Sequence, residues 1–365
     1  MRRIIGYVLV LVSSQCFAQG KYVIAGNFSK IQNGKIFLSV YNDGGTFSDS
    51  SKILNGKFSF KGSVEKPATG VLSYNNGDGN NYYQFYVEPA NMTITGEGDS
   101  LKLLNISGSK LNDDNKILVA SMKPISDWED RDSKIYSTAV KAKDKKVLDS
   151  LDKVDWEILA AKRKVVNEFV KNHPSSLSSA IAISDNYGYY AEADDVLPLY
   201  NTLDVSIKNS SSGKGILKMI DSYKKVAIGM TMPNIVQDDT SGHPLALSSL
   251  RGHYVLVDFW ASWCGPCRRE NPNIVAAYNN FHSKGLEIFG VSYDNQKGAP
   301  KWKKAINDDK LFWHQVSDLK GWQNETSDRF YIKAIPANFL LDKNGKIIGK
   351  NLFGEKLMDK LKELM

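Results

Sequence analysis

The chain has 365 residues, of which 42% are hydrophobic, and its formal net charge is +7 at pH 7. This length exceeds what one hydrophobic core usually supports, so two or three domains are expected. The positive charge comes from lysines interspersed with acids and forms no long basic block. Because nucleic-acid binding requires a clustered basic surface, no nucleic-acid partner is expected.

The first 18 residues have the pattern of an export signal. Two arginines precede an apolar run over residues 4–12, which is too short for a lasting membrane anchor, and small residues precede a cleavage point after Ala18. Export followed by cleavage of this segment would leave a periplasmic protein, which is the expected localisation. The alternative is a membrane-anchored lipoprotein acylated at Cys16, although the preceding glutamine stands where that processing prefers a small residue.

Residues 20–110 are predicted to form a small all-β domain. Short runs of alternating polar and apolar residues, such as 35–40 and 57–61, are separated by turn sequences rich in asparagine and glycine. This pattern is typical of a β-sandwich or a barrel-like sheet, and both arrangements remain open.

Residues 111–226 are predicted to be helical, because glycine becomes rare while lysine, aspartate, alanine and leucine increase. Apolar residues recur at helical spacing from Leu148 to Phe169 and predict one long amphipathic helix that ends before Pro174. Shorter helices are expected over 177–184, 196–207 and 215–226. We interpret the region as a spacer that packs on its neighbours.

Strands and helices alternate over residues 228–365, which is typical of an α/β domain with a covered sheet. The nearly continuous apolar run Tyr254–Trp260 predicts a strand buried on both faces. The other expected elements are a hairpin over 234–237 and 244–247, a helix over 266–282, a strand over 286–292, a helix over 301–306, a short strand over 313–316, a hairpin over 337–341 and 346–349, and a helix over 354–365.

Cys264 and Cys267 are separated by two residues, and Cys16 is the only other cysteine. A disulfide of such short spacing stabilises a fold very little, so in an exported protein this pair is expected to be a reversible redox disulfide. Cys264 should lie at a helix N-terminus, where unpaired N–H groups and the helix dipole stabilise a thiolate. Cys267, nearly one turn further along, is the expected resolving thiol.

Half of a zinc site is the alternative interpretation of the cysteine pair. A complete site requires two further cysteine or histidine ligands at suitable spacing, whereas the five histidines are scattered along the sequence. We therefore expect neither a metal site nor another cofactor.

The segment Val255–Cys267, VLVDFWASWCGPC, resembles the active-site segment of thioredoxins. Together with Gly229–Pro233 and with CGPCRRE over Cys264–Glu270, it resembles the exported TlpA/ResA-like thiol–disulfide oxidoreductases over residues 228–365. Residues 55–62 are similar to part of a small β domain, DUF4369-like, that is often fused to such proteins in Bacteroidetes. The resemblance implies an α/β thioredoxin-like C-terminal domain with a central mixed sheet and flanking helices.

Two carboxylic acids join the cysteines as expected catalytic residues. Asp258 lies in an apolar strand, where burial should raise its pKa, and it matches the buried acid of thioredoxins that accepts the proton of the inner cysteine. Glu270 shares a helix face with Cys267, and the resemblance implies a second proton acceptor and specificity element. The alternatives are a hydrogen-bonded structural acid at Asp258 and a solvated first-turn acid at Glu270.

Five residues are expected to bind the substrate. Trp263, Gly265 and Pro266 belong to the cysteine motif, and Trp263 should be partly exposed. The resemblance implies a cis peptide bond between Ile335 and Pro336 that faces the disulfide, with the Ile335 backbone receiving an extended substrate strand. The alternatives are plain packing for Trp263 and a trans proline at a strand start.

The expected function is the reduction of protein disulfides, because the Gly-Pro pair between the cysteines is that of thioredoxins. In an oxidising compartment this activity requires an electron source, so a membrane thiol reductant is an expected partner. ResA-like relatives reduce apocytochrome disulfides before haem attachment, which implies a role in cytochrome c biogenesis, but the sequence itself names no substrate and no redox direction.

Two other functions remain open. A peroxiredoxin of the AhpC/TSA type has threonine and proline three and seven residues before its reactive cysteine, whereas this chain has Ala261 and Val257 there. The other alternative is a binding or scaffold protein with a minor redox role, against which the intact motif argues. The segment 20–226 is also the candidate for contacts in an oligomer.

Overall fold

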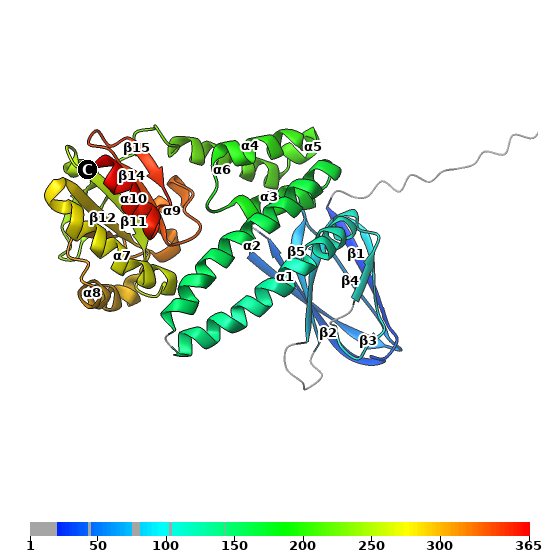
Figure 1. Cartoon of the computed structure of the whole chain (residues 1–365). Coiled ribbons are helices and arrows are strands. Elements are labelled where there is room, and N and C mark those ends of the chain that lie inside the picture. Colours follow the sequence, from blue (N-terminus) through cyan, green and yellow to red (C-terminus); the bar gives the residue numbers. More distant parts are fainter. Residues whose placement is uncertain (1–19, 43–44, 75–80, 102–103, 143) are drawn as a thin grey trace, which may run out of the picture. The chain divides into compact units, whose positions relative to one another are not determined.

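The computed structural model describes residues 20–42, 45–74, 81–101, 104–142 and 144–365 (Figure 1). The predicted export signal over 1–18 and Cys16 lie outside these residues. The chain divides at Pro124 into two compact units, the second of which is Ile125–Met365. None of the described helices is both long enough and apolar enough to span a bilayer.

Eight strands of the first unit form one continuous sheet in the order β6-β5-β2-β3-β4-β1-β7-β8. All neighbours are antiparallel except β1 and β7, which are parallel. Alternate side chains enter one apolar core, as Tyr22, Ile24 and Phe28 do from β1, and the predicted all-β domain is confirmed. The strands are β1 (Lys21–Phe28), β2 (Asn33–Asn42), β3 (Gly45–Leu54), β4 (Lys57–Ser63), β5 (Ala68–Tyr74), β6 (Tyr82–Val87), β7 (Asn91–Gly96) and β8 (Leu104–Ser107).

The turn between β3 and β4 shows why this domain has its turn residues. Asn55 and Gly56 both have positive φ, 52° and 76°, as a type I′ hairpin turn requires. A Cβ atom on Gly56 would lie 2.1 Å from the Phe28 carbonyl oxygen, so only glycine fits there.

The described part of the chain continues after the first sheet with the helices α1 (Lys110–Ala142), α2 (Lys145–Asn172), α3 (Leu177–Tyr187), α4 (Ala193–Thr202), α5 (Val205–Lys208) and α6 (Ser211–Lys225). The predicted long helix over 148–169 is confirmed within α2. Three predicted helices have other bounds, and the one expected over 177–184 continues to Tyr187. The helix expected over 196–207 is divided into α4 and α5, and α4 begins earlier because Glu192 and Asp195 form a capping box. The helix expected from 215 begins at Ser211, because the Ser210 side chain caps it.

The C-terminal sheet has the order β10-β9-β13-β12-β11-β14-β15. Its central strand β11 (Tyr254–Trp260) is parallel to β12 (Leu286–Ser292) and antiparallel to β14 (Ala337–Leu341), which makes the sheet mixed. The remaining elements are β9 (Val236–Asp239), β10 (Pro244–Ala246), β13 (His314–Ser317), β15 (Ile347–Lys350), α7 (Gly265–Phe281), α8 (Ala299–Asp308), α9 (Glu325–Arg329) and α10 (Glu355–Leu364). Each element expected in this segment is present, with ends shifted by at most two residues.

Apolar clusters cover both faces of this sheet. Val257 and Phe259 of β11 pack in one cluster with side chains of α8 and of the segment after α9, whereas Leu256 packs in the other with side chains of α7 and α10. Because alternate residues of a strand point to opposite faces, β11 is apolar along nearly its whole length. The predicted α/β thioredoxin-like fold is therefore confirmed.

Within the unit Ile125–Met365, the helices pack against this sheet through a buried cation. The side chain of Lys350, on the edge strand β15, is only 7% exposed, and its Nζ lies 2.6 Å from a carboxylate oxygen of Glu192 at the start of α4. The same ammonium lies 5.9 Å from the ring centroid of Tyr223 and 5.4 Å from that of Phe339. The helical segment is thus tied to the sheet that carries the cysteines.

Candidate functional site

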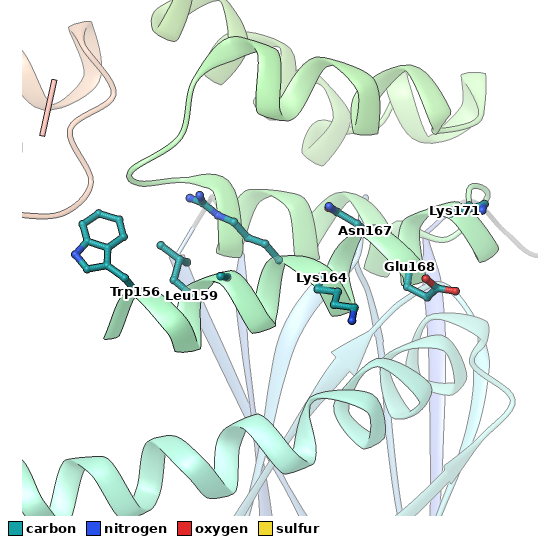
Figure 2. Close-up of a pocket in the computed structure, with 8 residues that line it drawn as sticks. Trp156, Leu159, Lys164, Asn167, Glu168 and Lys171 are labelled. Carbon is teal, nitrogen blue, oxygen red and sulfur yellow. The ribbon is translucent and has the colours of Figure 1, made fainter. Parts of the chain in front are cut away.

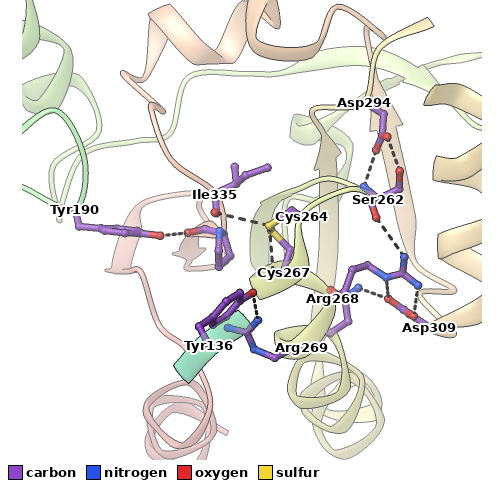
Figure 3. Close-up of a disulfide and its surroundings, with 12 residues drawn as sticks. Tyr136, Tyr190, Ser262, Cys264, Cys267, Arg268, Arg269, Asp294, Asp309 and Ile335 are labelled. Carbon is purple, nitrogen blue, oxygen red and sulfur yellow. Dashed lines mark hydrogen bonds and ion pairs between the residues drawn. A yellow bond between two sulfur atoms is a disulfide. The ribbon is translucent and has the colours of Figure 1, made fainter. Parts of the chain in front are cut away.

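Cys264 and Cys267 form a disulfide where β11 leads into α7 (Figure 3). Cys264 is the N-cap residue of α7, and its Sγ accepts a hydrogen bond of 3.1 Å from the backbone N–H of Cys267. Pro266 occupies the first turn, where a missing N–H breaks no helical hydrogen bond. The outer sulfur therefore faces the N–H groups of a helix start, a position that favours negative charge.

Ile335 and Pro336 lie beside the outer sulfur. The peptide bond between them is cis, as expected, which excludes the trans alternative. The carbonyl oxygen of Ile335 lies 3.7 Å from Cys264 Sγ. The structure thus brings together the two segments that the sequence places about 70 residues apart.

Trp263 is 54% exposed, which confirms its expected partial exposure, and its ring centroid lies 6.1 Å from that of Trp322. Trp322 is itself 45% exposed and was not predicted as a site residue. The two indoles form an exposed aromatic pair on the surface next to the outer cysteine.

Asp258 is buried in β11, and this burial raises the pKa of its carboxyl to about 8. The negative charge of Glu270 contributes in the same direction. The expected direction of the pKa shift is therefore confirmed. A carboxyl with this pKa changes its protonation state near neutral pH, as a proton acceptor in catalysis must.

Glu270 is half-buried on α7 and does not simply extend into solvent. One carboxylate oxygen accepts a 2.7 Å hydrogen bond from the backbone N–H of Gly354, the N-cap of α10, and the other accepts a 2.9 Å bond from Asn273 Nδ2. The carboxylate is therefore held in one orientation between two helices of the domain.

A charged cluster that the sequence analysis missed fixes the first turn of α7. The guanidinium of Arg268 makes two parallel hydrogen bonds to the carboxylate of Asp309, one of them 2.7 Å long. Asn271 Nδ2 donates to the same carboxylate at 2.6 Å. No motif could have revealed this cluster, because Asp309 follows Arg268 by 41 residues and pairs with it only in the folded chain.

Arg268→Ala is expected to lower the unfolding free energy of the oxidised protein by about 1.5–3 kcal/mol, the usual contribution of hydrogen bonds to a charged group. Lys304→Ala is the matched control, because it removes an exposed pair with Asp308 on α8, which should contribute about 0.5 kcal/mol or less. Urea unfolding curves of both variants test this prediction. Equal losses would show that the Arg268–Asp309 pair contributes no more than an ordinary surface ion pair.

A second cluster fixes the loop that precedes the cysteines. The backbone N–H and the hydroxyl of Ser262 donate to the buried carboxylate of Asp294 at 2.8 Å and 2.6 Å. Ser292 Oγ donates to the same carboxylate at 2.9 Å. Because Ser262 lies two residues before Cys264, this network fixes the backbone that leads to the outer cysteine.

Two tyrosines of the helical segment also reach the site, one at the cis proline and one at the cysteine motif, and neither was predicted. The hydroxyl of Tyr190 donates a 2.7 Å hydrogen bond to the carbonyl oxygen of Pro336. The hydroxyl of Tyr136 accepts a 3.1 Å bond from Arg269 Nη1 and lies 3.5 Å from the position that a Cβ atom on Gly265 would occupy (Figure 3). The helical segment is therefore part of the immediate surroundings of the disulfide.

Among the described residues, no group of three or more histidine, cysteine, aspartate or glutamate side chains is placed to hold a metal ion.

Comparisons with known proteins agree with this geometry. The AhpC/TSA family matches residues 228–350, and a domain of unknown function, DUF4369, matches residues 22–115. The chain is 32% identical over 138 residues to a thiol-disulfide oxidoreductase ResA of Bacillus cereus, a match that covers 38% of this chain and 76% of the relative. It is 30% identical over 125 residues to ResA of Bacillus subtilis (strain 168), covering 34% of this chain and 67% of the relative.

Among solved structures, the thioredoxin domain of a thiol-disulfide oxidoreductase from Bacteroides vulgatus is 38% identical and covers 38% of this chain and 97% of that chain, with a TM-score of 0.36. The resemblances found in the sequence, at both the N-terminal and the C-terminal domain, are confirmed by the matched families and relatives. From the identity and coverage of the ResA relatives we conclude that this chain belongs to the ResA-like family of thiol–disulfide oxidoreductases.

Proposed function

We propose that this protein is exported and reduces disulfides of other proteins with the dithiol of Cys264 and Cys267. The observation that carries the proposal is the position of Cys264 Sγ at the N-terminus of α7, facing the N–H of Cys267. Export is supported by the signal-like pattern of residues 1–18. The proposed domains of the mature chain are 20–110, 111–226 and 228–365.

The reaction has two thiol–disulfide exchanges. The Cys264 thiolate attacks one sulfur of the substrate disulfide, forms a mixed disulfide, and releases the other substrate sulfur as a thiolate. Cys267 then attacks Cys264 Sγ, which releases the second substrate thiol and closes the Cys264–Cys267 disulfide. Two electrons pass from the protein to the substrate, and a membrane thiol reductant is the proposed source that restores the dithiol.

The carboxyls and the proline segment support these exchanges. Asp258 accepts the proton of Cys267 before the second exchange, and Glu270 is the second proton acceptor and a specificity element. An extended substrate strand lies along Ile335 and Pro336, in contact with Trp263, Gly265 and Pro266. Because of the resemblance to ResA, we propose the disulfides of apocytochromes as one substrate class.

A trapping experiment tests this function. Without its resolving thiol, the Cys267→Ser variant should accumulate mixed disulfides through Cys264 in cells, which non-reducing gels would separate and mass spectrometry would identify. Cys264→Ser and the double variant are the matched controls. Recovery of no more partners than with Cys264→Ser would contradict the proposal that proteins are the substrates.

A further inference from the structure

A cavity of about 370 Å³ lies beside the disulfide, within the unit Ile125–Met365. One side is formed by the redox domain, through Pro266, Ile335 and Pro336. The other side is formed by α2 and by the segment that follows α3. The cavity therefore adjoins the surface on which the proposed substrate strand would lie.

The helical segment lines part of the cavity with aromatic and aliphatic side chains. Trp156 and Leu159 of α2 line it together with Tyr190, and Phe353 closes it from the redox domain. The ring of Tyr190 lies 4.8 Å from that of Trp156 and 6.5 Å from that of Phe353, measured between centroids. These contacts form a continuous row of three aromatic rings that runs from the helical segment to the redox domain.

The charged groups that line the cavity have partners within the protein. Lys162 Nζ lies 2.5 Å from a carboxylate oxygen of Glu129. Glu270 accepts hydrogen bonds from Gly354 and Asn273, and Arg269 donates to Tyr136. Asp149, which pairs with Lys145, and Asp155 also line the cavity. The surface that the cavity offers to an uncharged side chain is therefore its aromatic and aliphatic part.

Tyr190 is held firmly in this wall. Its backbone has a φ of 50°, a left-handed conformation that is unfavourable for a residue with a bulky side chain. The guanidinium of Arg163 donates hydrogen bonds to the carbonyl oxygens of Tyr189 and Tyr190, at 2.7 Å and 3.1 Å, and so secures this turn. The hydroxyl is fixed in turn on Pro336, and the ring presents one surface to the cavity.

We propose that this cavity binds one bulky apolar side chain of the substrate polypeptide, within two residues of the cysteine that is attacked. The inference rests on the proposed disulfide reduction. In an extended strand, residues two apart point to the same side and are separated by about 7 Å, so a substrate cysteine at Cys264 directs a neighbouring side chain towards this wall. The volume is at the lower end of the range for ligand pockets, about 300–1,000 Å³, and suits a side chain better than a folded segment.

An open groove of about 550 Å³ continues along α2 and shares Trp156 and Leu159 with the cavity (Figure 2). Lys164, Asn167, Glu168 and Lys171 follow one another along it. Trp156 therefore stands at the border between the cavity and this groove, and it is 43% exposed. Substitution of this side chain should change the cavity without disturbing a buried core.

The test uses the reduced full-length protein and a panel of short peptides. Each peptide carries one cysteine as a mixed disulfide with thionitrobenzoate, whose release on attack is read by absorbance. Phenylalanine is placed in turn at each position within two residues of that cysteine, in an otherwise glycine and serine background. All rate constants are divided by that for Ellman's reagent, which has no side chain for the cavity.

The wild type is expected to react about tenfold or more faster with the best phenylalanine peptide than with the all-glycine peptide. Trp156→Ala should bring this ratio close to one, and Trp156→Phe should restore most of it. Phe312→Ala is the matched control, because Phe312 is 68% exposed and does not line the cavity; it should keep the wild-type ratio.

Three results would overturn the inference: a wild-type ratio near one, a ratio that survives Trp156→Ala, or an equal loss in Phe312→Ala. A different failure would reach the proposed function itself. If the reduced wild type released thionitrobenzoate neither from any peptide nor from Ellman's reagent, the dithiol would not act as a reductant. Equal release from all peptides would leave the reductase intact and reject only the cavity.

Discussion

Disulfide reduction by Cys264→Ser is expected to be on the order of 10³-fold or more slower than by the wild type, as is usual when an enzyme loses its nucleophile. A serine hydroxyl is not ionised at neutral pH, so the helix N-terminus that faces this position has no thiolate to stabilise. Reduction of insulin by the purified protein, with a dithiol as electron source, measures the loss against the uncatalysed rate.

Cys267→Ser supplies the contrast for this prediction. This variant keeps the outer sulfur, so its first exchange with Ellman's reagent should still occur. The reaction should stop after one equivalent of thionitrobenzoate has been released per protein molecule. If Cys264→Ser reacted as fast as Cys267→Ser in that first step, the assignment of the outer cysteine as the attacking residue would be wrong.

Replacement of Asp258 by asparagine is the second change with a large expected effect. With a pKa of about 8, the buried carboxyl can accept the Cys267 proton only as the pH rises through that value. The rate of the second exchange can be measured as the release of substrate from a preformed mixed disulfide. In the wild type this rate should therefore increase as the pH rises through 8. In Asp258→Asn it should be about 10²–10⁴-fold slower above this pH and should lack the inflection.

Glu270→Gln tests the electrostatic part of this prediction. The charge of Glu270 contributes to the raised pKa of Asp258, so its removal should move the inflection to lower pH. An unchanged inflection in Asp258→Asn would show that another group controls the second exchange.

The same pKa shift predicts the sign of a stability change. Between the ordinary value of 3.8 and the raised value of about 8, the folded protein keeps a proton on Asp258 that the unfolded chain has lost. The contribution of Asp258 to the unfolding free energy therefore falls as the pH rises between these two values, by at most about 1.4 kcal/mol for each pH unit. Denaturant unfolding should accordingly show Asp258→Asn more stable than the wild type, and more so at pH 8 than at pH 5.

The redox domain could be predicted almost element by element because its signals are local. The apolar run of β11 and the hairpin sequence between β14 and β15 each specify a structure within a few residues. The 33-residue α1 was not predicted as one helix, because polar residues interrupt its apolar spacing and Pro124 lies within it. The apolar spacing alone would allow one continuous helix over α4 and α5. The capping residues that end α4 and begin α5 divide it, and the spacing does not reveal them.

The site residues also fall into two groups: those with a signal in the sequence and those that only the folded chain brings together. The motif cysteines follow from residue types at fixed spacing, and the burial of Asp258 follows from its apolar strand, whereas the cis proline was expected only from the resemblance to thioredoxin-like proteins. Tyr190 and Tyr136 could not be found, because their partners are 146 and 133 residues away and the contacts exist only after the helices pack. No local pattern indicated that the helical segment belongs to the site, although it supplies one wall of the cavity.

The buried ammonium of Lys350 has a consequence for how this protein opens. If α4 detached while the rings of Tyr223 and Phe339 stayed packed around Lys350, the cation would lose its counter-ion within a covered site, and an uncompensated buried charge is strongly unfavourable. Fraying of the helical segment should therefore carry β15 with it, and backbone amides of both should exchange with deuterium in a single event. The redox domain would then share its cooperativity with the helices, and would not unfold as an autonomous module.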